Sequence, residues 1–254
     1  MQRVYPATRE FTVIAMNTLL NINGLVKRFV LHTRGGKVID ALKDLSLEVR
    51  EGEFLGLTGP SGSGKSTILK CIYRTYVPTQ GEIWYKSGRY GTVNLASLSE
   101  HAIIDLRKNE IGFVSQFLKI IPRVSALDIV AEPLFTRNGT TPEKARLKAV
   151  ELLERLHIYP QLFDAYPLTF SGGEQQRINI ARAVICRPRV LLLDEPTSML
   201  DQRTASLVLD MLGEIRNEGT TMIGVFHDVD TLRTVADRVY DLERGAYTNG
   251  HRHP

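Results

Sequence analysis

The sequence predicts an α/β protein built on a mostly parallel sheet, and three observations carry that prediction. Short apolar runs at 54–57, 111–114, 190–193 and 222–226 alternate with helix-forming segments. The run 190–193 contains no polar residue, which is typical of a strand buried on both faces of a parallel sheet. Polar residues follow directly where these runs end. The chain therefore reads as one α/β domain with a cluster of polar side chains at one edge of its sheet.

Composition excludes several classes of protein. The 254 residues are 43% hydrophobic and 24% charged, with a net charge of +4 spread over scattered Lys and Arg, so nucleic-acid binding is not expected as the main function. No apolar run approaches the length of a membrane span, and Phe11–Met16 is too short for a signal peptide. We expect a cytoplasmic protein that reaches a membrane only through a partner, with Cys71 and Cys186 as buried thiols.

The first part of the chain is predicted to be antiparallel β structure. Residues 1–17 form an extension, within which Met16 offers a second possible start. From residue 19 the apolar pattern suggests strands on both sides of a polar turn at 32–37, and a further strand is predicted at 81–85. Residues 87–98 are polar and predict a surface hairpin. A short helix is expected at 100–108.

A helical subdomain is predicted at about 117–185, inserted in a domain that spans 18–250. Thr141, Pro142 and Glu143 form a strong helix start, and the helix should run to about 157. Glu151 and Arg155 are spaced to pair on its outer face. After the subdomain come a helix at 202–217 and, at 239–242, the last predicted strand; residues 251–254 are a tail too short to indicate a metal site.

Residues Gly59–Thr67, GPSGSGKST, match the phosphate-binding pattern G-x-x-x-x-G-K-[ST]. Glycines let consecutive backbone N–H groups face one anion, and the helix that follows adds a partial positive charge. Lys65 would reach the outer phosphates of a nucleotide, and the Ser66 hydroxyl would bind Mg²⁺. A plain turn between strand and helix is the alternative, but strand, loop, lysine and helix occur together. The segment is therefore predicted to bind a nucleotide.

Four polar residues end the later apolar runs. Asp194 is predicted to hold Mg²⁺ and Glu195 to polarise an attacking water, while Gln116 would bind the metal or orient water. His227 would hydrogen-bond the terminal phosphate. Each residue taken alone is better explained as a solvent-facing strand end. Together, at one sheet edge, they indicate a shared site.

The segment Ser171–Glu174, SGGE, has the Ser-x-x-Glu spacing of a helix capping box. The box explains Ser171 and Glu174 but leaves the two glycines unexplained, since glycine is disfavoured in a helix by about 1 kcal/mol relative to alanine. Glycines at a helix start allow an anion to approach the backbone. Because 59–67 already serves the phosphates, we expect two chains to enclose ATP between that loop and this helix.

In order and spacing, these motifs resemble the nucleotide-binding domain of ABC ATPases over about residues 19–245. The motifs that carry the resemblance are GPSGSGKST, Gln116, FSGGEQQR (Phe170–Arg177), VLLLDEPTSMLD (Val190–Asp201) and the histidine of VFHD. It implies a P-loop NTPase fold, Mg²⁺-dependent ATP hydrolysis and a second ABC ATPase domain as partner. One departure is Glu174, where most members carry glutamine; the capping box is compatible with glutamate.

The resemblance also implies the roles of the site residues. It implies Glu195, His227 and Gln116 as catalytic residues and Ser66, Gln116 and Asp194 as metal ligands. Phe29 matches the position of an adenine-stacking aromatic, whereas its position in a strand alone favours a core residue over a ligand contact. The implied ATP-binding residues are Phe29, Gly59, Pro60, Ser61, Gly62, Ser63, Gly64, Lys65, Ser66, Thr67, Ser171, Gly172, Gly173 and Glu174.

Three segments, 114–130, 169–183 and 224–239, look most like the ATP-binding subunit of the phosphonate carbon–phosphorus lyase system. In that family the subunit accompanies a multi-subunit complex that makes ribose 1-phosphonate 5-triphosphate from ATP and phosphonate. The alternative is the ATPase motor of a lipoprotein or macrolide exporter, which shares the Gln116-Phe117 pair, the Ser125-Ala126-Leu127 triplet and the GGE signature. A membrane permease would then be the partner. A scaffold ATPase acting on nucleic acid has no support, because the sequence has no basic stripe.

Overall fold

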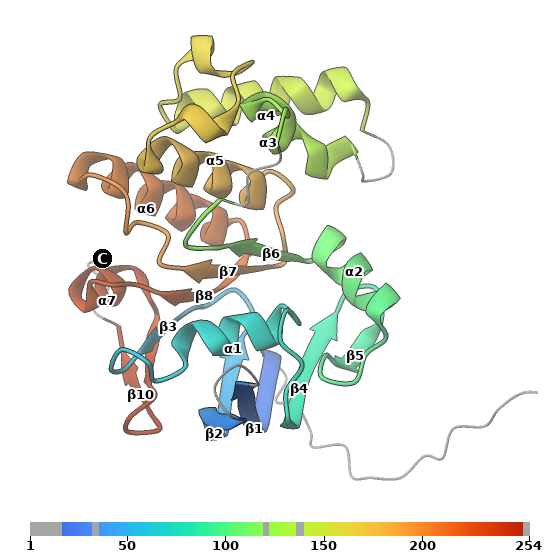
Figure 1. Ribbon diagram of the computed structural model, residues 1–254, viewed down its shortest axis with the longest axis vertical. Helices are drawn as coiled ribbons and strands as arrows, with labels where there is room; N and C mark the ends of the chain where they lie inside the picture. Colours follow the sequence, from blue (N-terminus) through green and yellow to red (C-terminus); the bar gives the residue numbers. More distant parts are fainter. Residues whose placement is uncertain (1–16, 32–35, 119–121, 136–139, 251–254) are drawn as a thin grey trace, which may run out of the picture.

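The computed structural model describes residues 17–31, 36–118, 122–135 and 140–250. The predicted extension before residue 17, the start at Met16 and the tail after residue 250 lie outside these residues. Within them are two sheets and a set of helices that cover one of the sheets (Figure 1). This architecture confirms the predicted α/β fold, with an antiparallel N-terminal part and a largely parallel central sheet.

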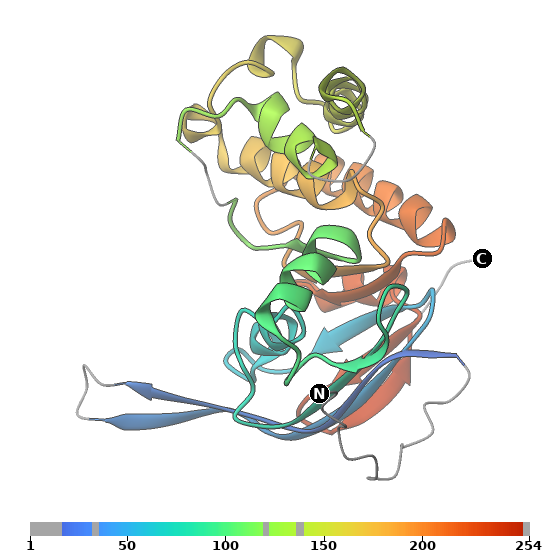
Figure 2. The same cartoon turned by 90° about the vertical axis from the view of Figure 1, so that its right-hand side faces the viewer.

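The smaller sheet has four antiparallel strands in the order β2-β1-β4-β5. Its strands are β1 (Thr18–Leu31), β2 (Lys37–Arg50), β4 (Gln80–Ser87) and β5 (Gly91–Asn94). Figure 2 shows the paired β1 and β2 extending as a ribbon beyond the rest of the molecule. The predicted 87–98 hairpin is wrong in one respect: Leu95 is fully buried, because it packs into the core between the sheets.

The larger sheet has the order β10-β9-β3-β8-β7-β6. Five strands are parallel: β3 (Phe54–Thr58), β6 (Ile111–Val114), β7 (Val190–Asp194), β8 (Thr221–Val225) and β9 (Arg238–Asp241). The prediction that 239–242 is the last strand was wrong. An antiparallel strand, β10 (Ala246–Asn249), follows; the exposed side chains of its four residues gave no apolar signal.

The larger sheet separates two hydrophobic cores. Successive residues of β7 alternate between them: Leu191 and Leu193 face one core, and Val190 and Leu192 the other. This explains why the run contains no polar residue, since both faces are covered. The second core lies between the two sheets and includes α1 (Lys65–Ile72) and α2 (Glu100–Asn109).

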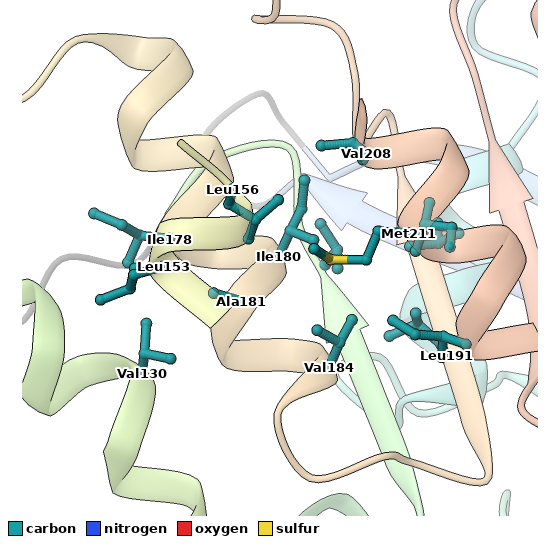
Figure 3. Packing of buried hydrophobic residues seen from close by; sticks show 14 of the residues in the cluster. Val130, Leu153, Leu156, Ile178, Ile180, Ala181, Val184, Leu191, Val208 and Met211 are labelled. Carbon is teal, nitrogen blue, oxygen red and sulfur yellow. The ribbon is translucent and has the colours of Figure 1, made fainter. Parts of the chain in front are cut away.

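The first core joins the sheet to helices that lie beyond it. These are α3 (Ala126–Phe135), α4 (Pro142–Arg155), α5 (Gly172–Val184), α6 (Gln202–Asn217) and α7 (Val229–Val235), with two short 3₁₀ turns at Pro160–Leu162 and Pro167–Thr169. Figure 3 shows the side chains of α5 between those of α3 and α4 on one side and those of α6 and β7 on the other. Helix α5 therefore connects the helical region to the sheet.

Helix α4 begins as predicted, since the Thr141 side chain accepts a hydrogen bond from the Lys144 N–H. The predicted Glu151–Arg155 pair was wrong. Arg155 donates to Glu214 of α6 at 2.6 Å, because α6 brings a carboxylate within reach that the local sequence could not reveal. No helix in the described ranges is both long and apolar enough to cross a membrane.

Candidate functional site

The phosphate-binding loop runs from the end of β3 to the start of α1, and its backbone is shaped by glycine. Gly64, the residue before α1, has φ +97°, a backbone conformation that residues other than glycine rarely adopt. A Cβ atom there would lie 2.4 Å from the carbonyl oxygen of Ala41. The Gly64 carbonyl accepts from the Ile68 N–H at 2.9 Å, so this residue also opens the helix.

Lys65 lies against the loop. Its Nζ donates to the carbonyl oxygens of Gly59, at 2.7 Å, and of Pro60, at 2.9 Å. Partial burial lowers the pKa of Lys65 from its ordinary value, and the nearby Glu195 carboxylate opposes that shift. The Lys65 ammonium group is thus held against the loop, where the outer phosphates of a nucleotide would bind.

The order of the strands brings the predicted polar residues to one edge. Strands β3, β8, β7 and β6 are consecutive neighbours and parallel, so their carboxyl ends lie side by side. The Ser66 hydroxyl donates to Oδ1 of the buried Asp194 at 2.6 Å, joining α1 to the end of β7. Nε2 of Gln116, beyond β6, donates to Oε2 of Glu195 at 3.0 Å.

Glu195 has an unusual backbone. Its φ is +52°, in the left-handed region that non-glycine residues visit rarely. Its N–H donates to the carbonyl of Val225 at the end of β8, and its carbonyl accepts from the Ser198 N–H and hydroxyl. These bonds hold the strained residue, and strain of this kind is concentrated at functional sites.

His227 stands apart from this network. It follows β8 on the same edge and is exposed. Among the described residues, its side chain makes no hydrogen bond, and the next residue, Asp228, caps α7. The structure therefore places His227 on the same sheet edge as the other predicted site residues but does not connect it to Glu195.

The donor set fits Mg²⁺ and a phosphate. A hydroxyl and a carboxylate, Ser66 and Asp194, already lie at hydrogen-bond distance, and oxygen donors of this kind are those Mg²⁺ prefers. Within the described residues the buried Ser63 hydroxyl has no hydrogen-bond partner. A buried unpaired hydroxyl is costly, so a ligand atom at this position would satisfy it.

The start of α5 forms the predicted capping box. The Ser171 hydroxyl accepts from the Glu174 N–H at 3.3 Å, and Oε2 of Glu174 accepts from the Ser171 N–H at 2.8 Å and from its hydroxyl at 2.7 Å. These bonds lower the pKa of Glu174. The helix start thus carries its own carboxylate where an anion would bind.

The two glycines of this helix start are explained by a packing contact that the local sequence does not reveal. A Cβ on Gly172 would lie 3.2 Å from Sδ of Met199, and one on Gly173 would lie 3.1 Å from the Met199 carbonyl oxygen. Neither has a positive φ. The loop between β7 and α6 therefore packs directly on the start of α5, and glycine provides the space.

Phe29 lies on β1 and is half-buried. Its ring meets the edge of Tyr76 with centroids 5.0 Å apart, and Nζ of Lys27 lies 4.8 Å from its centroid. The ring is thus neither a core residue nor fully exposed.

Two functional candidates on α5, Gln176 and Asn179, were missed. Both are buried, and their amides donate to backbone carbonyls beside Glu195 and Gln116. The local sequence held no clear signal for them, because Gln176 lies between two polar residues and only Asn179 lies between apolar residues.

A cleft of about 420 Å³ lies between α2, the first residues of β6, α3 and α5. Arg107, Lys108 and Arg182 give it an excess of positive charge over Glu132. Cys186 lies in its wall and is half-buried. Cys71 differs, because burial raises the pKa of its thiol to about 11.

Comparison with known proteins gives concordant results. The family model described as "ABC transporter" matches residues 42–198. The arginine transport ATP-binding protein ArtP of Haemophilus influenzae is 37% identical over 80% of this chain and 83% of its own length. The lipoprotein-releasing system ATP-binding protein LolD of Acinetobacter baylyi is 35% identical over 85% of this chain and 92% of its own length.

A solved structure agrees with these matches. The ATP-binding cassette MJ0796, described as a dimer in a post-hydrolysis state bound to ADP and Pi, superposes with a TM-score of 0.83 and 31% identity. The match covers 92% of this chain and all of the other. By sequence, MJ0796 of Methanocaldococcus jannaschii is 36% identical over 83% of this chain.

Proposed function

This chain belongs to the ABC transporter family and is an ATP hydrolase that uses Mg²⁺, and we propose that it is the ATP-binding subunit of a membrane exporter of the lipoprotein-releasing type. The observation that carries the proposal is the shared sheet edge, where the loop lysine, a hydroxyl–carboxylate pair and a glutamine–glutamate pair meet. Similarity to LolD over 92% of its length supports the exporter class. We place the chain on the cytoplasmic side, docked on a permease.

The residues have distinct proposed roles. Lys65 and the loop N–H groups bind the outer phosphates, and Phe29 stacks on the adenine. Ser66, Asp194 and Gln116 hold Mg²⁺, which offsets phosphate charge when bound. Glu195 orients and polarises the attacking water, and His227 reaches the terminal phosphate only when nucleotide draws the loops together.

We further propose that two such domains enclose each ATP. Within one chain the phosphate-binding loop and the start of α5 make separate contacts. Lys65 contacts its own loop, whereas Ser171–Glu174 lies against Met199, in the loop after β7. The helix start would then meet the nucleotide held by the other domain. The dimeric structure of the MJ0796 cassette supports this arrangement.

Exchange of Glu195 for glutamine tests the enzymatic role. Glu195→Gln should lower kcat at least about 100-fold and leave an ATP-bound dimer that elutes as such in size-exclusion chromatography with Mg·ATP. Glu154→Gln, the same exchange on the exposed face of α4, is the matched control and should behave as wild type. Unchanged turnover in Glu195→Gln would refute the role.

The cleft beside α2 and α3 is the proposed contact for the permease. Its positive charge favours an acidic or carboxyl-bearing segment of the partner. Lys108→Glu should reduce recovery of the permease from detergent-solubilised membranes while leaving ATP hydrolysis by the isolated chain unchanged. Lys144→Glu, on the exposed surface of α4, is the control.

A second candidate is the ATP-driven subunit of a phosphonate carbon–phosphorus lyase complex. It rests on the three sequence segments 114–130, 169–183 and 224–239, whereas the relatives described above are transporter ATPases. The two candidates differ in the partner. Recovery of the tagged chain in a soluble assembly that converts a phosphonate with ATP would replace the exporter proposal, and recovery with a permease would exclude the lyase.

A further inference from the structure

Two buried amide side chains on α5 reach the loops that carry the site. Gln176 is 1% exposed and Asn179 is 6% exposed. Since they are three residues apart, they lie on one face of the helix. A buried amide is stabilising only when its donors and acceptors are paired, so the partners of these two groups explain why they are there.

Each amide donates to a carbonyl next to a proposed site residue. Nδ2 of Asn179 donates to the Ser115 carbonyl at 2.6 Å, and Ser115 directly precedes Gln116. Nε2 of Gln176 donates to the carbonyl of Pro196 at 3.2 Å, directly after Glu195.

The two amides also meet each other, with Nδ2 of Asn179 3.5 Å from Oε1 of Gln176. The result is a continuous path of polar contacts from the loop after β6, across α5, to the loop after β7. The path ends at the backbone carbonyls of Ser115 and Pro196. The residues next to these two carbonyls, Gln116 and Glu195, hydrogen-bond each other through their side chains at 3.0 Å. Neither amide contacts them directly.

We propose that Asn179, supported by Gln176, is a positioning residue that sets Gln116 against Glu195 and the metal site. The proposal rests on the proposed roles of Gln116 and Glu195. Because Asn179 fixes the carbonyl immediately before Gln116, its loss lets the glutamine backbone shift while the phosphate loop stays as it is. Catalysis and metal use then change, and ATP binding does not.

A double-mutant cycle on the full chain tests this step. Asn179→Ala should lower kcat about 5-fold, the effect of one lost hydrogen bond, and raise the half-saturating Mg²⁺ concentration about 3-fold. The KM for ATP should stay within about 2-fold. In a Gln116→Ala background the same substitution should lower kcat no further, because the group it positions is already gone.

Thr220→Val is the matched control. The Thr220 hydroxyl is buried and donates to the Pro188 carbonyl at 2.9 Å, so its loss removes a comparable bond outside the site. It should lower thermal stability without changing kcat or the Mg²⁺ dependence. If Asn179→Ala does not fold, Asn179→Leu keeps the volume and removes the donor.

Equal losses of kcat in the two backgrounds would overturn the proposal, as would a rise in KM alone or no change at all. Wild type and Glu195→Gln are measured in the same assay. A large loss in Glu195→Gln leaves the ATPase assignment standing even when the Asn179 result is negative, so the two failures can be told apart.

Discussion

Glycines lie at the starts of both α1 and α5: Gly64 directly precedes α1, and Gly172 is the first residue of α5. The two starts use glycine for different physical reasons. At α1, Gly64 is required by backbone conformation, with φ +97° and a carbonyl 2.4 Å from the position of a Cβ. At α5, Gly172 has ordinary helical geometry, and the nearest atom is the flexible end of Met199. The two starts also differ in charge: Lys65 stands at the first and Glu174 at the second. The start of α1 is shaped to bind an anion, whereas the start of α5 already carries an anionic side chain, the Glu174 carboxylate.

The largest expected effect is on folding, at the first helix start. Gly64→Ala should lower the free energy of unfolding by about 3–4 kcal/mol, from the left-handed conformation and from overpacking against Ala41. Urea denaturation measures it. Gly62→Ala is the control: it has φ +81° but open space, so only about 1 kcal/mol should be lost. Equal losses would mean that the close contact is unimportant.

The next effect is on nucleotide binding. Lys65→Met should weaken ATP binding about 100-fold in isothermal titration calorimetry, because the partly buried cation loses its charge where the phosphates would lie. Lys70→Met, in the last turn of the same helix, should bind ATP as wild type does. A small change in the Lys65 variant would place the phosphates elsewhere.

At the second helix start the expected effect falls on assembly rather than folding. Gly172→Ala should keep stability within about 1 kcal/mol of wild type, since alanine favours the helix and Met199 can move aside. The added methyl should weaken the ATP-dependent dimer about 10-fold in analytical ultracentrifugation. Gly213→Ala, in α6 with open space around it, should stabilise the chain and leave the dimer unchanged. A dimer unaffected by Gly172→Ala would separate α5 from the nucleotide site.

The smallest effect concerns the carboxylate of Glu174. Glu174→Gln preserves the capping box and removes a negative charge, so the ATP-dependent dimer should tighten about 3-fold. Glu143→Gln is matched, because Glu143 also lies in a first turn with a lowered pKa, yet it is on α4 and should not affect the dimer. A weaker dimer in Glu174→Gln would show that the carboxylate is needed for assembly.

We also expect the stability difference between wild type and Glu174→Gln to depend on pH. The pKa of Glu174 is lowered in the folded chain, so its ionised form stabilises the fold above the unfolded pKa, about 4.5. That contribution is lost as the pH falls through the folded pKa. Wild type should therefore lose its advantage in thermal midpoint over Glu174→Gln only in acid.

Much of the fold could be predicted because local sequence patterns indicate its strands and helix starts. The parallel strands were visible as apolar runs, since both faces of the sheet are covered, and helix starts such as Thr141 and Ser171 have local capping signals. Strand β10 was not visible. Its four residues are exposed, and pairing with β9, which the local sequence does not encode, places it.

The candidate site likewise has one part that the sequence predicts and one part that depends on long-range packing. Residues 59–67 and the acidic strand end at 194–195 could be identified from spacing, whereas their meeting depends on the neighbour order β3-β8-β7-β6. The buried amides of α5 and the contact of Met199 with Gly172 are long-range packing, with no periodic signature. Arg155 shows the limit: its spacing to Glu151 was suitable, but Glu214 lies closer in space.

The unequal cysteines offer a way to observe the cleft. A maleimide reacts with the thiolate, and the fully buried Cys71, with a pKa raised to about 11, presents almost none at neutral pH. Cys186 is more accessible and lies in the cleft wall. A fluorophore could therefore be attached there in the native sequence, and a change in its emission on adding solubilised permease would test the proposed contact at this cleft.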